Sequence, residues 1–305
     1  MTLYIIGNGF DLHLNLTTSY SDFARYLKSK NYKLYESLIR YFHLTANWSN
    51  FEESFSSFQI KHALNAIDEY LPEENNERSG NEWNYYDQAE ELINNLLRNI
   101  QNAVNDWIIS LDYSELKKSN SLYFKSNSKI LSFNYTKTIE NYIKPNSKIL
   151  HIHGIAIKSQ KYHWKPDERD LDLPEMEDSE IILGHSPITC SQKYIHHPDF
   201  DSYQNVLRSI NFDTLLRFID ESEKNTNQII QNNQNFFNSL NSCNEIVVYG
   251  HSLGNCDLPY FYEIIKNIPK KTVFTFYYHS NEDLNKINTF ASKNLKNNLV
   301  IKKQW

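Results

Sequence analysis

Glycine and polar side chains occur together at four places in the chain, each directly after a run of apolar residues. Apart from Gly80, these segments hold every one of the 7 glycines. Histidine, asparagine, aspartate and serine can bind a polar ligand or exchange protons with it, and glycine lets another group approach the backbone closely. The pattern predicts one polar site built from several turns. The segments are Gly7-Asn8-Gly9-Phe10-Asp11, His151-Ile152-His153-Gly154, Gly184-His185-Ser186 and Gly250-His251-Ser252-Leu253-Gly254, with Asp257 just beyond.

The first turn resembles half of a dinucleotide-binding fingerprint. It has G-x-G after an apolar run, but Leu12 stands where the third glycine of G-x-G-x-x-G would be. A turn between a strand and a helix still offers backbone N–H groups that suit a phosphate. We therefore predict that this turn binds a nucleotide cofactor through Gly7, Asn8, Gly9, Phe10 and Asp11.

The last segment matches the G-x-S-x-G nucleophile elbow of α/β hydrolases, with Ser252 as the nucleophile. That reaction needs an acid and then a histidine further along the chain. Only His279 follows, and Asp257 comes directly after the motif. We therefore interpret the segment as a turn that binds the same ligand, and a serine hydrolase remains the alternative. The expected binding residues are Gly250, His251, Ser252 and Asp257.

Two further polar positions follow predicted strands. His151 and His153 would lie on one side of a strand, as in H-x-H metal sites, but no H-E-x-x-H or comparable spacing accompanies them. We expect no metal, and a metal-dependent hydrolase stays open. Asn134 carries an amide that suits ribose hydroxyls or a water molecule, and asparagine is also a common helix N-cap.

The apolar runs predict the elements that position these residues. Several are apolar on both faces, as in a parallel sheet covered by helices, and helical patterns separate most of them. We expect an α/β fold, namely a Rossmann-like, mainly parallel, doubly wound sheet. The predicted strands are 3–6, 129–133, 147–152, 180–183, 245–249, 272–278 and 299–302. The predicted helices are 51–71, 90–111, 201–242 with a break inside it, 259–268 and 281–293.

A large helical insertion is expected after the first strand. Roughly 120 residues separate the first two strands, far more than the dozen or so that one crossover needs. We therefore predict a nucleotide-binding core of residues 1–29 and 128–305, and a helical insertion or cap of residues 30–127. An acidic stretch at 158–179 is expected to be a loop.

Composition restricts the class of protein. Hydrophobic residues make up 40% of the 305 residues, which excludes a disordered chain, and the formal net charge of −6 argues against a dedicated duplex-DNA binder. The 3 cysteines form no C-x-x-C pair, as is typical of a reducing compartment. The first predicted strand lies directly after the starting methionine, with no room for a signal peptide, and no apolar run approaches the roughly 18 residues of a membrane span. We expect a cytoplasmic protein without a membrane partner.

Taken together, the motifs resemble the AbiH family of bacterial phage abortive-infection proteins. The resemblance runs from Leu3 to Phe261 and rests on an ordered set of segments. It implies antiphage defence by arrest or death of the infected cell, and it supplies no reaction. The segments are "IIGNGFDL…TSYSDF", "ILSFNYTKTIE", "HIHG", "IILGHS" and "VVYGHSLGNCDLPYF".

More remotely, the order of motifs is similar to the sirtuin-like fold that consumes NAD. That likeness implies that Asn134 binds the nicotinamide ribose or positions water and that His153 is the general base. It also implies that the first glycine turn holds the phosphates of NAD and that the Gly250 turn holds the adenosine side. Thr136 stands where sirtuins usually have aspartate, and the four zinc cysteines of sirtuin deacylases are missing.

The expected function is therefore an antiphage effector, leaning towards an enzyme that hydrolyses NAD as its substrate. A histidine near its unperturbed pKa, in a polar cleft, would suit the proton transfer at cytosolic pH. Two alternatives stay open, namely a nucleotide sensor without turnover that gates a partner, and a metal-dependent or nucleic-acid hydrolase. A related nucleotide, a phage-derived trigger and self-association are the other partners considered.

Overall fold

The fold is built on a six-stranded parallel sheet. The computed structural model describes residues 1–73, 81–114, 116, 124–143, 147–158, 181–187 and 202–305. Within these ranges every strand pairs in parallel, which confirms the α/β class. In spatial order the strands are β3 (Ile149–His151), β2 (Ser128–Ser132), β1 (Thr2–Ile6), β4 (Glu245–Tyr249), β5 (Val273–Tyr278) and β6 (Val300–Gln304).

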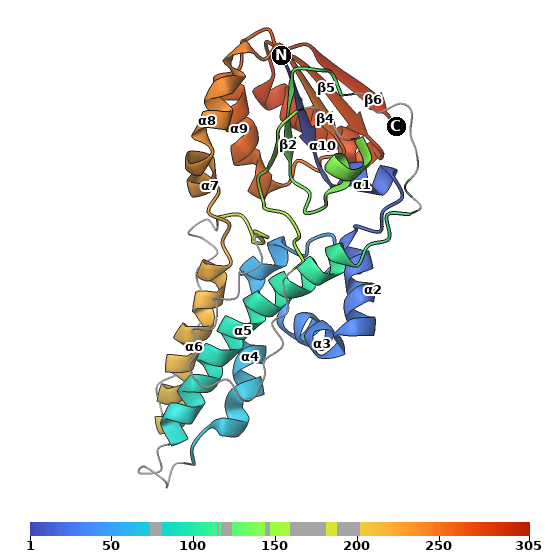
Figure 1. The fold of residues 1–305 in the computed structure, drawn as a ribbon. Helices are drawn as coiled ribbons and strands as arrows, with labels where there is room; N and C mark the ends of the chain where they lie inside the picture. Colours follow the sequence, from blue (N-terminus) through green and yellow to red (C-terminus); the bar gives the residue numbers. More distant parts are fainter. Residues whose placement is uncertain (74–80, 115, 117–123, 144–146, 159–180, 188–201) are drawn as a thin grey trace, which may run out of the picture.

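Strand β1 is a continuous apolar run because both of its faces are buried. Leu3 and Ile5 pack into one hydrophobic cluster, and Tyr4 and Ile6 pack into another. Alternate side chains of a strand point to opposite faces, so the two clusters lie on the two sides of the sheet. The surrounding helices are α1 (Asn8–His13), α7 (Thr226–Asn232), α8 (Gln234–Asn238), α9 (Leu258–Asn267) and α10 (Asn281–Asn294) (Figure 1).

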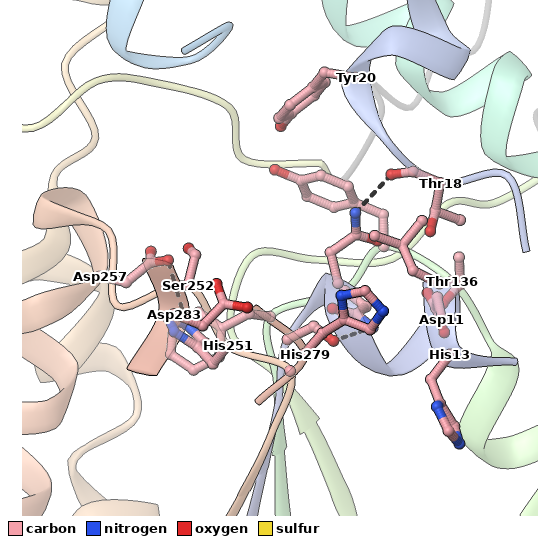
Figure 2. A pocket seen from close by; sticks show the side chains of 18 of the residues that line it. Asp11, His13, Thr18, Tyr20, Thr136, His251, Ser252, Asp257, His279 and Asp283 are labelled. Atoms are coloured by element: carbon pink, nitrogen blue, oxygen red, sulfur yellow. Dashed lines mark hydrogen bonds and ion pairs between the residues drawn. The ribbon is translucent and has the colours of Figure 1, made fainter. Parts of the chain in front are cut away.

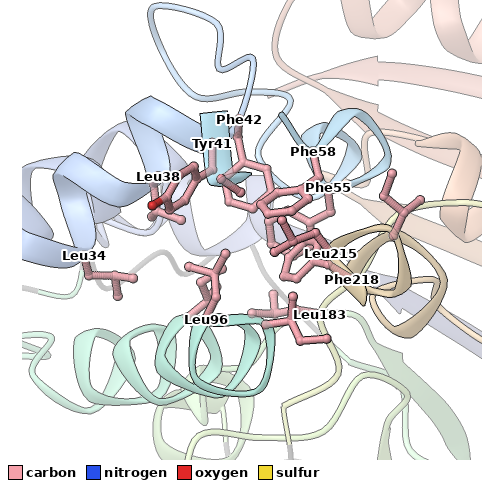
Figure 3. Packing of buried hydrophobic residues seen from close by; sticks show 14 of the residues in the cluster. Leu34, Leu38, Tyr41, Phe42, Phe55, Phe58, Leu96, Leu183, Leu215 and Phe218 are labelled. Carbon is pink, nitrogen blue, oxygen red and sulfur yellow. The ribbon is translucent and has the colours of Figure 1, made fainter. Parts of the chain in front are cut away.

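A separate group of helices, the helical body, extends away from the sheet (Figure 1). It shares one hydrophobic cluster in which α6, from the second half of the chain, packs against helices from the first half. Figure 3 shows Phe218 of α6 among Phe42, Phe55 and Phe58. The helical body comprises α2 (Tyr20–Lys30), α3 (Tyr32–Tyr41), α4 (Ile60–Ile67), α5 (Asn81–Ile109) and α6 (Tyr203–Glu221).

The apolar run at 181–183 lies outside the sheet. The predicted strand at 180–183 is wrong for residues 181–183, which join no strand. Ile181 and Leu183 instead pack into the cluster of the helical body, which buries an apolar run as well as a sheet does.

The division of the chain into a helical insertion of residues 30–127 and a core stays a prediction. The hydrophobic cluster of the helical body also includes residues of α2 and α6 that this division assigns to the core. The acidic loop at 158–179 lies outside the described residues, except for Lys158.

Candidate functional site

A cavity of about 780 Å³ lies between the ends of the central strands and the helical body. We call it the central cavity. Of the eleven residues predicted to form the site, ten line it, and Phe10 instead packs in the core beside Tyr249. The ten are Gly7, Asn8, Gly9, Asp11, Asn134, His153, Gly250, His251, Ser252 and Asp257. Figure 2 shows several of their side chains facing the same space.

The two glycine turns contact each other at the bottom of this site. The Gly7 N–H donates to Tyr249 O (2.9 Å) and the Gly9 N–H donates to Gly250 O (2.8 Å). A Cβ atom on Gly9 would lie 2.7 Å from the Gly250 Cα, and Gly250 has a φ of +58°. Glycine is therefore required because two backbones meet here. The predicted role of this turn in binding phosphate stays a prediction.

Asn134 is held directly after β2. Its Nδ2 donates to Gly7 O (3.2 Å), which ties the ends of β2 and β1 together. The side chain is buried, and its Oδ1 has no hydrogen-bond partner within the described part of the chain. The amide therefore serves the fold through its nitrogen and leaves its oxygen without a partner among the described residues.

His153 follows β3 and is 3% exposed. Its ring lies edge-on to Phe133 (5.2 Å between centroids) and Tyr260 (5.5 Å). Burial, with a smaller effect of the Lys224 charge, lowers the pKa of His153 from 6.5 to about 3. The expectation of a histidine near its unperturbed pKa in a polar cleft is therefore wrong, because aromatic packing removes the ring from water.

Asp257 lies between two histidines. Its Oδ1 is 3.6 Å from His153 Nε2, and its Oδ2 is 3.4 Å from His251 Nε2. Burial alone would raise the pKa of Asp257, but the contact with His251 and the charges of His153 and Lys224 outweigh burial and hold that pKa below its ordinary value. The carboxylate therefore stays ionised in the cavity wall (Figure 2).

Asp11 is a fully buried carboxylate on α1. Thr136 Oγ1 donates to its Oδ2 (2.6 Å), and Thr138 Oγ1 donates to Thr136 Oγ1 (2.9 Å). Burial raises the pKa of Asp11 to about 6, and the neighbouring polar side chains of Thr136, Thr138 and Asn134 only partly oppose this effect. Residue 136, where the sirtuin likeness would place an aspartate, therefore contacts a carboxylate supplied by α1.

Several residues that line this cavity carry a buried polar atom without a partner in the described chain. Within the described ranges seven buried side-chain atoms have no hydrogen bond, and four of them belong to residues that line the cavity. A buried polar atom left unpaired costs about 1–3 kcal/mol, so such a cluster indicates a place where a polar ligand or water binds. The four are Asp11 Oδ1, Thr18 Oγ1, Asn134 Oδ1 and His153 Nε2.

Sequence reasoning missed a buried ion pair in the cavity wall. Lys224 lies between α6 and α7, its side chain is 1% exposed, and its Nζ is 2.9 Å from Glu52 Oε2. Glu52 also accepts hydrogen bonds from Tyr20 and from the Gly184 N–H (3.3 Å). Among the described residues that line the cavity, Lys224 is the one lysine or arginine, beside four carboxylates. Both members of the pair lie in ordinary charged stretches, so no spacing signals them.

The other polar candidates have structural partners. His151 Nε2 is 2.7 Å from Glu140 Oε1, so it faces a different group from His153 and does not line the cavity. Both ring nitrogens of His185 lie against backbone carbonyl oxygens, of Ser186 and Ile219. Across the described ranges, no three His, Cys, Asp or Glu side chains are arranged to hold a metal ion. His163, His196 and His197 lie outside the described residues.

We expect Asp11→Asn to stabilise the protein at neutral pH. The pKa of Asp11 is raised from 3.8 to about 6 in the folded state, so the wild type loses stability as pH rises through that interval. The variant should be more stable by up to about 3 kcal/mol near pH 7.5, and the difference should vanish near pH 4. Urea unfolding at several pH values measures this. A variant that is less stable at every pH would contradict it.

The comparisons with known proteins give one match. The family model "Bacteriophage abortive infection AbiH" matches residues 3–279. No curated protein and no solved structure is significantly similar to the chain. In the described part of the chain, no helix combines the length and apolar character needed to cross a bilayer. Because the family model covers most of the 305 residues and the motifs of the cavity, the chain belongs to the AbiH family, whose function is phage abortive infection.

Proposed function

We propose that the central cavity binds NAD or a related nucleotide and hydrolyses the N-glycosidic bond to nicotinamide, which depletes NAD in infected cells. The observation that carries this proposal is that Asp11, Asn134 and His153, each with a buried polar atom that lacks a partner within the described ranges, line one cavity together. Ribose hydroxyls, a carboxamide and a water molecule are groups that such atoms bind. The volume of about 780 Å³ is in the range of cofactor sites.

The order of the strands supports a nucleotide ligand. The order β3-β2-β1-β4-β5-β6 reverses direction between β1 and β4. It is the order of the Rossmann-like, doubly wound folds that bind dinucleotides, in which the ligand lies at the carboxyl ends of the strands where the order reverses. The turns after β1 and β4 line the cavity through Gly7 and Gly250.

The chemistry fits an acidic cavity. The nicotinamide ring of NAD is cationic and leaves as a neutral molecule, so positive charge moves to the ribose. The transition state therefore resembles an oxocarbenium ion and is stabilised by nearby carboxylates such as Asp11. Water adds to the ribose carbon as the bond to nitrogen breaks, and the proton of the water leaves to a base. Asn134 would hold the water or the ribose, and His153 would take the proton.

A second function is favoured by one observation. The low pKa of His153 makes it a weak base in the free protein, and this suits a sensor that binds a nucleotide without turnover. Purified protein incubated with NAD, with and without phage lysate, distinguishes the two. Release of free nicotinamide supports hydrolysis. Calorimetric binding of NAD without nicotinamide release supports the sensor, and absence of binding refutes both.

Ser252→Ala tests the serine hydrolase alternative. Ser252 is exposed in the cavity, and no histidine of the described chain hydrogen-bonds it. We expect the variant to raise KM by up to about tenfold and to keep most of kcat, because it loses one ligand contact. Serine-directed covalent inhibitors should leave the wild type unlabelled. Loss of all activity together with covalent labelling of Ser252 would make it the nucleophile.

A further inference from the structure

Asp257 occupies the N-cap position of α9 without capping the helix. An aspartate at this position normally accepts a hydrogen bond from a backbone N–H of the first turn. Here the side chain makes no capping hydrogen bond. Its two oxygens lie instead 3.6 Å from His153 Nε2 and 3.4 Å from His251 Nε2. The carboxylate therefore contacts the two histidines, and through Oδ1 also accepts from the Cys256 thiol (3.6 Å), in place of capping its own helix.

The proton of neutral His251 is located by its backbone contact. The Leu253 N–H donates to His251 Nδ1 (3.0 Å), so Nδ1 is the acceptor and the ring proton is on Nε2. That proton faces Asp257 Oδ2. The tautomer of His251 is thus determined independently of Asp257.

His153 has no such backbone contact. Within the described chain its Nε2 has no hydrogen bond, and a carboxylate oxygen, which can only accept, lies 3.6 Å away. A ring nitrogen beside an ionised carboxylate favours carrying the proton. Nδ1 is then the nitrogen left to accept one. Long contacts of this kind shorten when a ligand binds.

We infer that Asp257 is a positioning residue, which holds the Nε2 protons of His153 and His251 so that His153 Nδ1 accepts the proton of the attacking water. The inference rests on the proposed function. In the reaction the water oxygen bonds to the ribose carbon, the electron pair of the glycosidic bond leaves with nicotinamide, and one water proton passes to Nδ1.

The substitution Asp257→Asn should affect the two histidines differently. A carboxylate accepts from both rings, whereas an amide has one acceptor oxygen and one N–H₂ donor. His251 keeps its Nε2 proton because Leu253 fixes it, so the amide oxygen should remain with His251. His153 then faces the N–H₂ group and should move its proton to Nδ1. The matched control is Glu263→Gln, on the same helix α9 and paired with Lys266.

The test is the ¹⁵N spectrum of the full-length protein with labelled histidine, with signals assigned through His153→Gln and His251→Gln. In the wild type and in Glu263→Gln, both rings should be in the Nε2–H form. In Asp257→Asn, His153 alone should change to the Nδ1–H form. A wild-type His153 in the Nδ1–H form, or a His153 tautomer that the variant leaves unchanged, would overturn the inference.

Activity provides the second measurement. Asp257→Asn should lower kcat for nicotinamide release by about a hundredfold, because the proton-accepting nitrogen is blocked, and should change KM by less than about threefold. A variant with wild-type kcat would also overturn the inference. If the tautomer changes as expected but wild-type protein releases no nicotinamide, the proposed hydrolysis fails while the positioning by Asp257 stands.

Discussion

Replacing His153 by glutamine is expected to lower NAD cleavage by at least about a hundredfold and to abolish toxicity in cells. Glutamine keeps a polar, neutral side chain of similar reach but cannot accept and release a proton as imidazole does. The lost contacts with Phe133 and Tyr260 should cost about 1–2 kcal/mol, so the protein should remain folded. Nicotinamide release, cellular NAD and thermal melts measure the three effects.

His151→Gln is the matched control for that experiment. His151 lies two residues earlier, pairs with Glu140 and does not line the cavity, so its replacement should leave most of the activity. Alanine is less informative at residue 153, because truncation of a buried ring leaves a cavity among aromatic side chains. A folded His153→Gln protein with wild-type activity would mean that the assigned site is not the reactive one.

Burial on both faces made most of the sheet predictable. The prediction at 245–249 has the same bounds as β4, and the prediction at 3–6 misses only the first residue of β1. A strand buried on both faces is a continuous apolar run, and this pattern is typical of parallel sheets covered by helices. The run at 181–183 has the same composition but packs against the helical body. Sequence periodicity cannot distinguish these two partners for so short a segment.

The location of the candidate site residues was predictable where these residues follow strand ends. Gly7, Asn134, His153 and Ser252 are far apart in the sequence, but parallel strands place their carboxyl ends at one edge of the sheet. The same reasoning placed Phe10 at the site, although its side chain turns into the core from α1. Position after a strand identifies the edge of the sheet, and it does not say which way each side chain points.

Long-range contacts were not predictable. Lys224 and Glu52 are separated by 172 positions and belong to charged stretches that look like solvated surface. The low pKa of His153 was missed for the same reason. It depends on burial and on the Lys224 charge, and both are determined by the tertiary structure. Residue type indicated which groups could do chemistry, while the packing around them decides their charge.

Lys224→Met is expected to be the most destabilising of the substitutions considered. Lys224 is the buried partner of Glu52, and removing one member of such a pair leaves the other charge without compensation at a cost of about 3–5 kcal/mol. Lys266→Met is the control, because Lys266 is 74% exposed beside Glu263 and its loss should cost less than about 1 kcal/mol. Urea unfolding near neutral pH measures both.

The double variant Lys224→Met/Glu52→Gln isolates the ion pair from general loss of packing. It removes both charges and leaves an amide that can still accept from Tyr20, so most of the lost stability should return. If the losses of stability of the two single variants simply add in the double variant, the ion pair is not the cause of the destabilisation.

The double variant should also change the pKa of His153. The Lys224 charge lowers that pKa, so the pKa should rise when the charge is removed, but it should stay below 6.5 because burial is the larger cause. An NMR titration of His153 that shows no change would mean that Lys224 has no influence on the proposed base.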